Sequence, residues 1–148
     1  MNCSTKRYEV QFKPVIQEEK SGCGIATVAV LAGVAYQEVK KAANGIGIRA
    51  EDRALWSDTA YVRRLLAHYG IKACEGEKPF SSWNTLPDLA LLAIKWRCVA
   101  ERPFWHWTLF VRDCQGKPAV LDPKKSLRSN VRRDFGRMRP KWFIPVVR

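Results

Sequence analysis

The sequence predicts an α+β domain in which a helical N-terminal half packs on a C-terminal antiparallel β-sheet. Apolar residues recur at helical spacing as far as residue 69, whereas branched and aromatic residues typical of strands dominate after residue 70. Helices that precede a run of strands favour two segregated layers. With 148 residues and 47% hydrophobic side chains, residues 1–148 are expected to form a single domain with a sizeable core.

Three helices are expected in the N-terminal half. The first is apolar on almost every side, as expected of a central buried helix. The second stops at Asn44 and Gly45, and the third follows Ser57 or Asp58, which are residue types that cap helices. The predicted helices span residues 23–34, residues 36–43 and the stretch from that cap to Tyr69, with residues 46–55 as a loop.

The strands are expected on either side of these helices, and most of them follow the third. Two of them flank the turn-forming residues 113–117, and this arrangement predicts an antiparallel hairpin. The predicted strands are residues 8–12, 71–74, part of 90–99, 105–112, 118–121 and 142–147.

Cys23 is the strongest candidate for a reactive group. It stands between Gly22 and Gly24, where a loop enters the apolar helix. The free N–H groups and the positive dipole at the start of a helix favour a thiolate, which is the nucleophilic form of cysteine. Glycine has no Cβ, so we expect the two glycines to let a substrate approach the backbone closely.

His106 and Asp122 are the candidate base and orienting group. His106 lies near the start of one strand of the predicted hairpin, and Asp122 near the end of the other. Antiparallel pairing brings these ends together, so the carboxylate is expected to bind the imidazole as in a catalytic triad. The only other histidine, His68, falls at the end of the third helix, where it suits the negative helix end.

Gln17 is the candidate oxyanion donor. Its amide and the Cys23 N–H would stabilise the oxygen that becomes negative when a thiolate attacks a carbonyl group. Preorganised donors of this kind typically contribute roughly 3 kcal/mol each to lowering the barrier.

These residues in this order resemble papain-like cysteine peptidases, and most closely the bacterial double-glycine (bacteriocin-processing) peptidase domains. The resemblance rests on Gln17 six residues before Cys23, and on His106-Trp107 and Asp122-Pro123 sixteen residues apart. It implies a papain-like fold and a thiol protease that hydrolyses peptide bonds with Cys23, His106, Asp122 and Gln17, without a metal or cofactor. The chain departs from the family at Gly22, where the family often has Asp.

The substrate and role are predicted from the same resemblance. Trp105 and Trp107 flank His106, and a groove narrowed by tryptophan would favour cleavage at Gly-Gly sites. The expected role is an interbacterial toxin domain that cleaves an essential target protein, with processing of leader peptides as the alternative. Deamidation or transglutamination by the same triad, and an inactive basic binding module, remain open.

Cysteine usage and the first twenty residues predict a cytoplasmic protein. The five cysteines form no zinc-like pattern, and their odd number favours free thiols in a reducing compartment. The first twenty residues contain no apolar signal core, so no secretory signal is expected. No apolar run is long enough to span a membrane. Delivery into another bacterial cell by a signal-free route is the alternative.

The charge of the chain is concentrated near its C-terminus. The net charge is +12, and residues 124–148 contain nine Lys/Arg and one Asp. Such a basic face either aids solubility or attracts an acidic partner, such as a substrate protein or an immunity-type inhibitor. A nucleic-acid partner is disfavoured because no recognised nucleic-acid motif is present.

Overall fold

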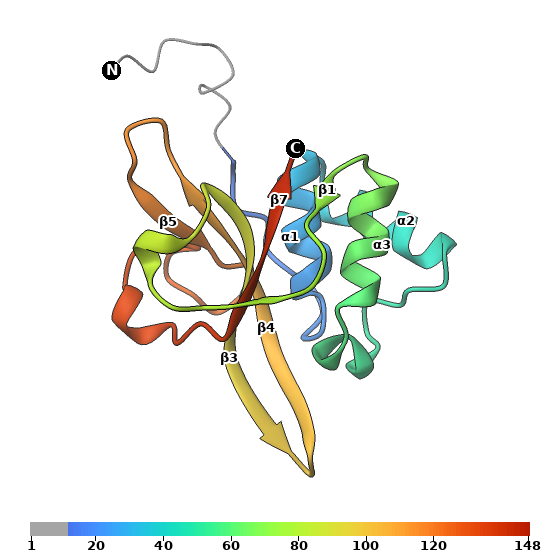
Figure 1. Ribbon diagram of the computed structural model, residues 1–148. Helices are drawn as coiled ribbons and strands as arrows, with labels where there is room; N and C mark the ends of the chain where they lie inside the picture. The colour runs from blue at the N-terminus through green and yellow to red at the C-terminus, as the bar shows by residue number, and fades with distance from the viewer. Residues whose placement is uncertain (1–11) are drawn as a thin grey trace.

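The computed structural model describes residues 12–148, and its fold is α+β as the sequence predicts. Three α-helices lie together on one side of the molecule, and an antiparallel sheet of seven strands lies on the other (Figure 1). The strand predicted for residues 8–12 falls outside the described residues, apart from Phe12. None of the helices in the described part of the chain has the length and apolarity needed to cross a membrane.

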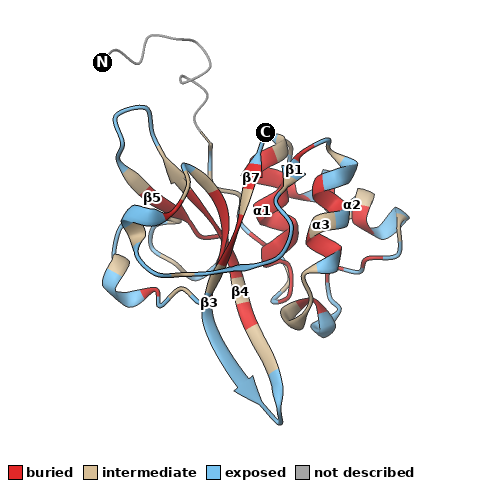
Figure 2. Ribbon diagram, in the orientation of Figure 1, coloured by how far each residue is buried: buried red, intermediate tan, exposed pale blue. Residues whose placement is uncertain are grey.

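Helix α1 is the centre of the helical half. It spans Cys23–Ala32, and every residue from Cys23 to Leu31 is buried, as its apolar sequence predicts (Figure 2). Gly33 ends the helix with a φ of 71°, in the left-handed conformation that glycine adopts most readily. The other two helices, α2 (Tyr36–Gly45) and α3 (Ala60–His68), pack on α1.

The segment between α2 and α3 differs in part from the prediction. It contains a 3-10 helix, η2 (Arg53–Ser57), within and just beyond the residues expected to form a loop. Helix α3 starts later than predicted, with Thr59 at its N-cap position. The Asp58 carboxylate still accepts a hydrogen bond from the Ala60 N–H at 2.9 Å, so Asp58 caps the start of the helix from one residue further out.

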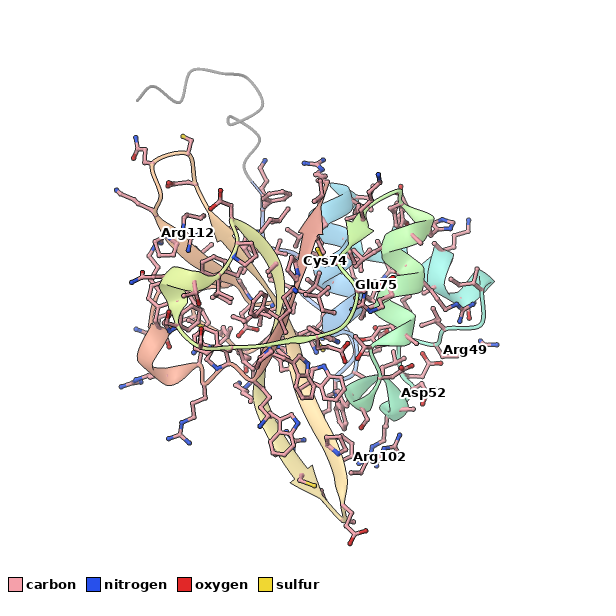
Figure 3. All side chains as sticks on the ribbon, in the orientation of Figure 1. Arg49, Asp52, Cys74, Glu75, Arg102 and Arg112 are labelled. Carbon is pink, nitrogen blue, oxygen red and sulfur yellow. The ribbon has the colours of Figure 1, made fainter. Side chains whose placement is uncertain are left out.

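The sheet is built around a long hairpin of β3 (Leu89–Val99) and β4 (Arg102–Arg112), whose far end extends beyond the body of the molecule in Figure 1. Arg102 and Arg112 mark the two ends of β4 in Figure 3. The strand order is β1-β7-β3-β4-β5-β6, and β2 also pairs with β7. The other strands are β1 (Lys72–Ala73), β2 (Lys78–Pro79), β5 (Pro118–Leu121), β6 (Val131–Arg132) and β7 (Trp142–Val147).

The sheet has a core on each face, because alternate residues of a strand point to opposite sides. From β3, Leu91 and Ala93 join the larger core beneath α1, whereas Leu92 and Ile94 join a smaller core on the other face. Residues outside the strands cover that smaller core, among them Met138 and Trp83, which belongs to the 3-10 helix η3 (Trp83–Thr85). Only the helical face of the sheet therefore brings α1 close to β4.

The cysteines correct one expectation. Cys23, Cys74 and Cys98 are free, but Cys114 in the turn after β4 is disulfide-bonded. The odd number of cysteines therefore does not mean that every thiol is free.

Candidate active site

The N-terminus of α1 meets β4 beyond the end of the pairing between β4 and β5, where no strand within residues 12–148 lies on that side of β4. Strand β5 pairs with β4 only as far as Leu109 opposite Leu121. Trp107 precedes Leu109 by two residues, outside this pairing, and its backbone N–H donates to Cys23 Sγ at 3.3 Å. The end of one short strand thus leaves a backbone donor that holds the sulfur of Cys23 beside His106.

Gly22 and Gly24 have a different role from the predicted one. Both are buried, and a Cβ added at Gly22 would lie 2.1 Å from the hydroxyl oxygen of Tyr36. A Cβ at Gly24 would lie 2.2 Å from the hydroxyl oxygen of Tyr61 and within 3.0 Å of two ring atoms. The glycines therefore allow two tyrosines from α2 and α3 to pack against the Cys23 backbone, rather than making room for a substrate.

His106 and Asp122 meet as their places in the hairpin predict. His106 Nε2 and Asp122 Oδ1 are 2.6 Å apart. The register of β4 and β5 places residue 122 diagonally from residue 106, a separation that long side chains bridge. The Asp122 side chain is 0% exposed and the His106 side chain 15% exposed, so the pair is largely shielded from water.

Asp122 is also held by groups that the sequence did not reveal. Arg132 Nη1 donates to Asp122 Oδ2 at 2.9 Å, and the Lys124 N–H donates to Asp122 Oδ1 at 3.0 Å. The Asn130 amide donates to the backbone carbonyls of residues 122 and 124 and fixes the turn after β5. Burial disfavours the carboxylate, but its bonds to His106, Lys124 and Arg132 outweigh burial and lower the pKa of Asp122 to about 2.

The surroundings of His106 favour the positively charged form of its ring. Burial disfavours that charge, but the hydrogen bond to Asp122 and the interaction with the Cys23 side chain outweigh burial and raise the pKa of His106 to about 9. An imidazolium between a carboxylate and a sulfur is the arrangement expected when a cysteine and a histidine form a reactive pair.

Gln17 is close to the site, but its amide is already bonded. Gln17 is buried and lines the same cleft as His106. Its backbone N–H donates to the carbonyl of Pro123 at 3.0 Å. Both hydrogens of Nε2 are directed to the carbonyls of Glu19 and Lys20, each at 2.9 Å. In this structure the Gln17 amide therefore supports the loop before Cys23 and has no hydrogen left for an oxyanion.

The Cys23 backbone offers a clearer oxyanion donor. Its N–H lies in the first turn of α1, where backbone N–H groups lack an intrahelical acceptor, and no side chain caps this end. Cys23 itself is 0% exposed and does not line the cleft, whereas His106 does. A substrate carbonyl reaches the sulfur only if neighbouring side chains move.

A cleft of about 460 Å³ opens at His106. Its apolar walls come from Trp56, Phe104 and Trp105, and the Trp56 and Phe104 rings meet edge to face at 6.2 Å. Trp107 is fully buried in the core, so of the two tryptophans beside His106 only Trp105 lines the cleft. Trp56 belongs to η2, which the sequence did not predict, and its indole N–H donates to the Lys20 carbonyl at 3.0 Å.

The remaining candidate groups lie elsewhere. His68 is exposed at the end of α3 and packs edge to face on Tyr69, as a helix-end residue would. Cys74 and Cys98 are exposed thiols, and Cys74, labelled in Figure 3, directly follows β1 in the chain. Within residues 12–148, no group of three or more His, Cys, Asp or Glu side chains is placed to hold a metal ion.

Two comparisons of the sequence with known proteins were made. A scan against protein-family models found no match, and a search of curated protein sequences also found none. The assignment of a function therefore depends on the geometry of Cys23, His106 and Asp122.

Proposed function

We propose that the protein is a papain-like cysteine peptidase. The observation that carries the proposal is the order of three side chains from distant parts of the chain: the Cys23 sulfur, the His106 imidazole and the Asp122 carboxylate. The buried Asp122 would hold the ring in one orientation and stabilise its positive charge.

In the proposed reaction, the Cys23 thiolate attacks the carbon of a peptide carbonyl. The oxygen becomes negative and accepts a hydrogen bond from the Cys23 N–H. The His106 imidazolium then gives its proton to the leaving amine, and a thioester to Cys23 remains. Water attacks the thioester, His106 accepts its proton, and a carboxylic acid leaves with Cys23 restored.

Gln17 joins this reaction only after a rearrangement. Its Nε2 must release the carbonyl of Glu19 or Lys20 to donate to the oxyanion. A movement of residues 18–20 that frees the amide would also change the cleft wall, because Glu18, Glu19 and Lys20 line it.

Cleavage of a protein mixture tests the proposal. A bacterial lysate is incubated with the protein or with Cys23→Ala, and new protein termini are identified by mass spectrometry. The proposal expects new termini with the wild type and with Cys98→Ala, whose thiol is exposed at the hairpin, but none with Cys23→Ala. Equal termini with and without Cys23 would overturn it, and side-chain mass changes without new termini would indicate deamidation or transglutamination.

The predicted Gly-Gly specificity and toxin role belong to the same proposal. The aromatic walls of the cleft support a preference for small residues at the cut, and a peptide panel with Gly-Gly and Ala-Ala sites tests it. Expression in a bacterium separates the two roles, because a toxin stops growth only with Cys23 intact, whereas a leader-processing enzyme leaves growth unchanged.

A second candidate is an inactive binding module with a basic surface. Two observations favour it: the complete burial of Cys23 and the prior engagement of the Gln17 amide. Buried cysteines commonly act as small apolar residues. Alkylation of Cys23 by iodoacetamide separates this candidate from the peptidase, because a packing cysteine reacts slowly.

A further inference from the structure

The cleft beside His106 is lined by more cations than its carboxylates can neutralise. Glu19 bonds Lys40, outside the cleft, and Glu18 bonds the Gln37 amide. Within residues 12–148, no carboxylate forms an ion pair with any of the five lysine and arginine side chains of the cleft. These cations are Lys20, Lys95, Arg97, Lys124 and Lys125.

Lys95 is turned toward the cleft by an irregularity in β3. The pairing of β3 with β4 slips between Ile94 and Arg97, and Lys95 has a φ of 55°. A left-handed conformation is unfavourable for a residue with a Cβ. Because strain of this kind concentrates at functional sites, the conformation of Lys95 calls for a functional explanation.

Lys124, in the connection between β5 and β6, lines the same cleft as Lys95. Its backbone is fixed on both sides, since its N–H bonds Asp122 and its carbonyl accepts from the Asn130 amide at 2.9 Å. Burial and then the neighbouring Lys124 ammonium lower the pKa of Lys95. Lys95 and Lys124 thus line the same cleft, and neither forms an ion pair with a carboxylate within residues 12–148, a position that an anion from outside would stabilise.

Resting on the proposed peptidase function, we infer that the cleft binds an acidic side chain of the peptide substrate between Lys95 and Lys124. The site lies next to the reacting groups, because His106 lines the same cleft and Asp122 bonds the Lys124 N–H. The acidic residue is thus expected within a few residues of the bond that is cut.

The surroundings favour a peptide carboxylate over a nucleic acid. Trp56, Phe104 and Trp105 give the cleft apolar walls that suit a peptide with one charged side chain. Glu18 and Glu19 also line the cleft, so its cations do not form the continuous positive groove that follows a phosphate backbone.

Peptide binding to the full chain with Cys23→Ala tests the inference without turnover. An immobilised library carries Glu, Gln or Lys in turn at each position, and single-stranded oligonucleotides of equal length are titrated in parallel. We expect peptides with Glu at one fixed position to bind about ten-fold more tightly than those with Gln. Replacing both Lys95 and Lys124 by Gln should abolish this preference.

A matched variant separates the site from the general charge. Lys41→Gln with Lys117→Gln removes the same charge from exposed residues outside the cleft and should keep the preference. Equal binding of Glu and Gln peptides, or a preference that survives loss of Lys95 and Lys124, would overturn the inference. Tighter binding of oligonucleotides that depends on the same two lysines would also overturn it.

Cleavage of the same library by the active protein distinguishes the two proposals. Selective binding of Glu peptides without any cleavage would support the acidic site and contradict the peptidase. Cleavage without a preference for Glu would support the peptidase and contradict the acidic site.

Discussion

The helical half and the sheet half of the molecule position their parts of the site by different means. Cys23 is held by packing, because it is buried in α1 and flanked by two glycines that touch tyrosines. His106 and Asp122 are held by charged hydrogen bonds. Changes in the helical half other than at Cys23 should therefore act mainly on stability, whereas changes in the sheet half should act mainly on activity and on pH dependence.

The largest expected effect is on the sheet side. Asp122→Asn removes the carboxylate from His106, so the ring loses the partner that orients it and stabilises its positive charge. Loss of the equivalent carboxylate in a catalytic triad lowers turnover by about 10⁴-fold, and we expect about 10³-fold or more here. Cleavage of a peptide substrate at saturating concentration measures the loss.

The matched control is Asp134→Asn. Asp134 bonds Arg132 at 2.7 Å, as Asp122 does at 2.9 Å, but it makes no bond to His106. Activity should stay within about three-fold of the wild type, as expected for an exposed ion pair. Equal losses in the two variants would mean that the Arg132 network, and not the contact with His106, determines activity.

The next effect is on the helical side. Gly24→Ala places a methyl group against the buried Tyr61 ring, and overpacking of this kind lowers the free energy of unfolding by about 2–4 kcal/mol. Gly45→Ala, which has nothing within 4 Å, should change it by less than about 1 kcal/mol. Urea denaturation measures both variants, and equal stabilities would show that the contact between Gly24 and Tyr61 is not tight.

The smallest effect is a pH dependence of stability that comes from His106. The folded pKa of about 9 exceeds the ordinary value of 6.5, so the folded state binds the proton more tightly than the unfolded state does. The stabilisation is complete below pH 6.5 and is lost as the pH rises through 9. It amounts to roughly 1–3 kcal/mol.

Unfolding by urea between pH 6 and 10 measures this dependence in the wild type and in His106→Gln. The difference in the free energy of unfolding between the two proteins should shrink as the pH rises. A constant difference would show that His106 is not protonated preferentially in the folded state.

The parts of the site that follow from local sequence were predictable. The turn between β4 and β5 sets the pairing that brings Asp122 to His106, and the apolar run after Cys23 gives α1. Arg132 was not predictable, because β6 has two residues and no periodic pattern. The tyrosine contacts of Gly22 and Gly24 depend on how α2 and α3 pack, so the same glycines suggested space for a substrate when only the sequence was considered.

The conformations of Gln17 and Lys95 could not be predicted from the sequence. Gln17 stands six residues before Cys23, but which groups its amide bonds depends on the path of residues 18–20. Lys95 reads as part of an ordinary strand, and its position in the cleft arises from the shift in register that follows Ile94. Both features result from the three-dimensional path of the backbone, and no pattern of residue types in the sequence indicates them.

Alkylation by iodoacetamide tests most directly whether Cys23 and His106 form a reactive pair. The adducts on Cys23, Cys74 and Cys98 are quantified separately by mass spectrometry at pH 6, so the two exposed thiols serve as internal references. The account predicts that buried Cys23 reacts faster than both, and that His106→Gln removes this advantage, because only the thiolate reacts. Slower reaction at Cys23 than at the two references, in both proteins, would contradict it and identify Cys23 as a core residue.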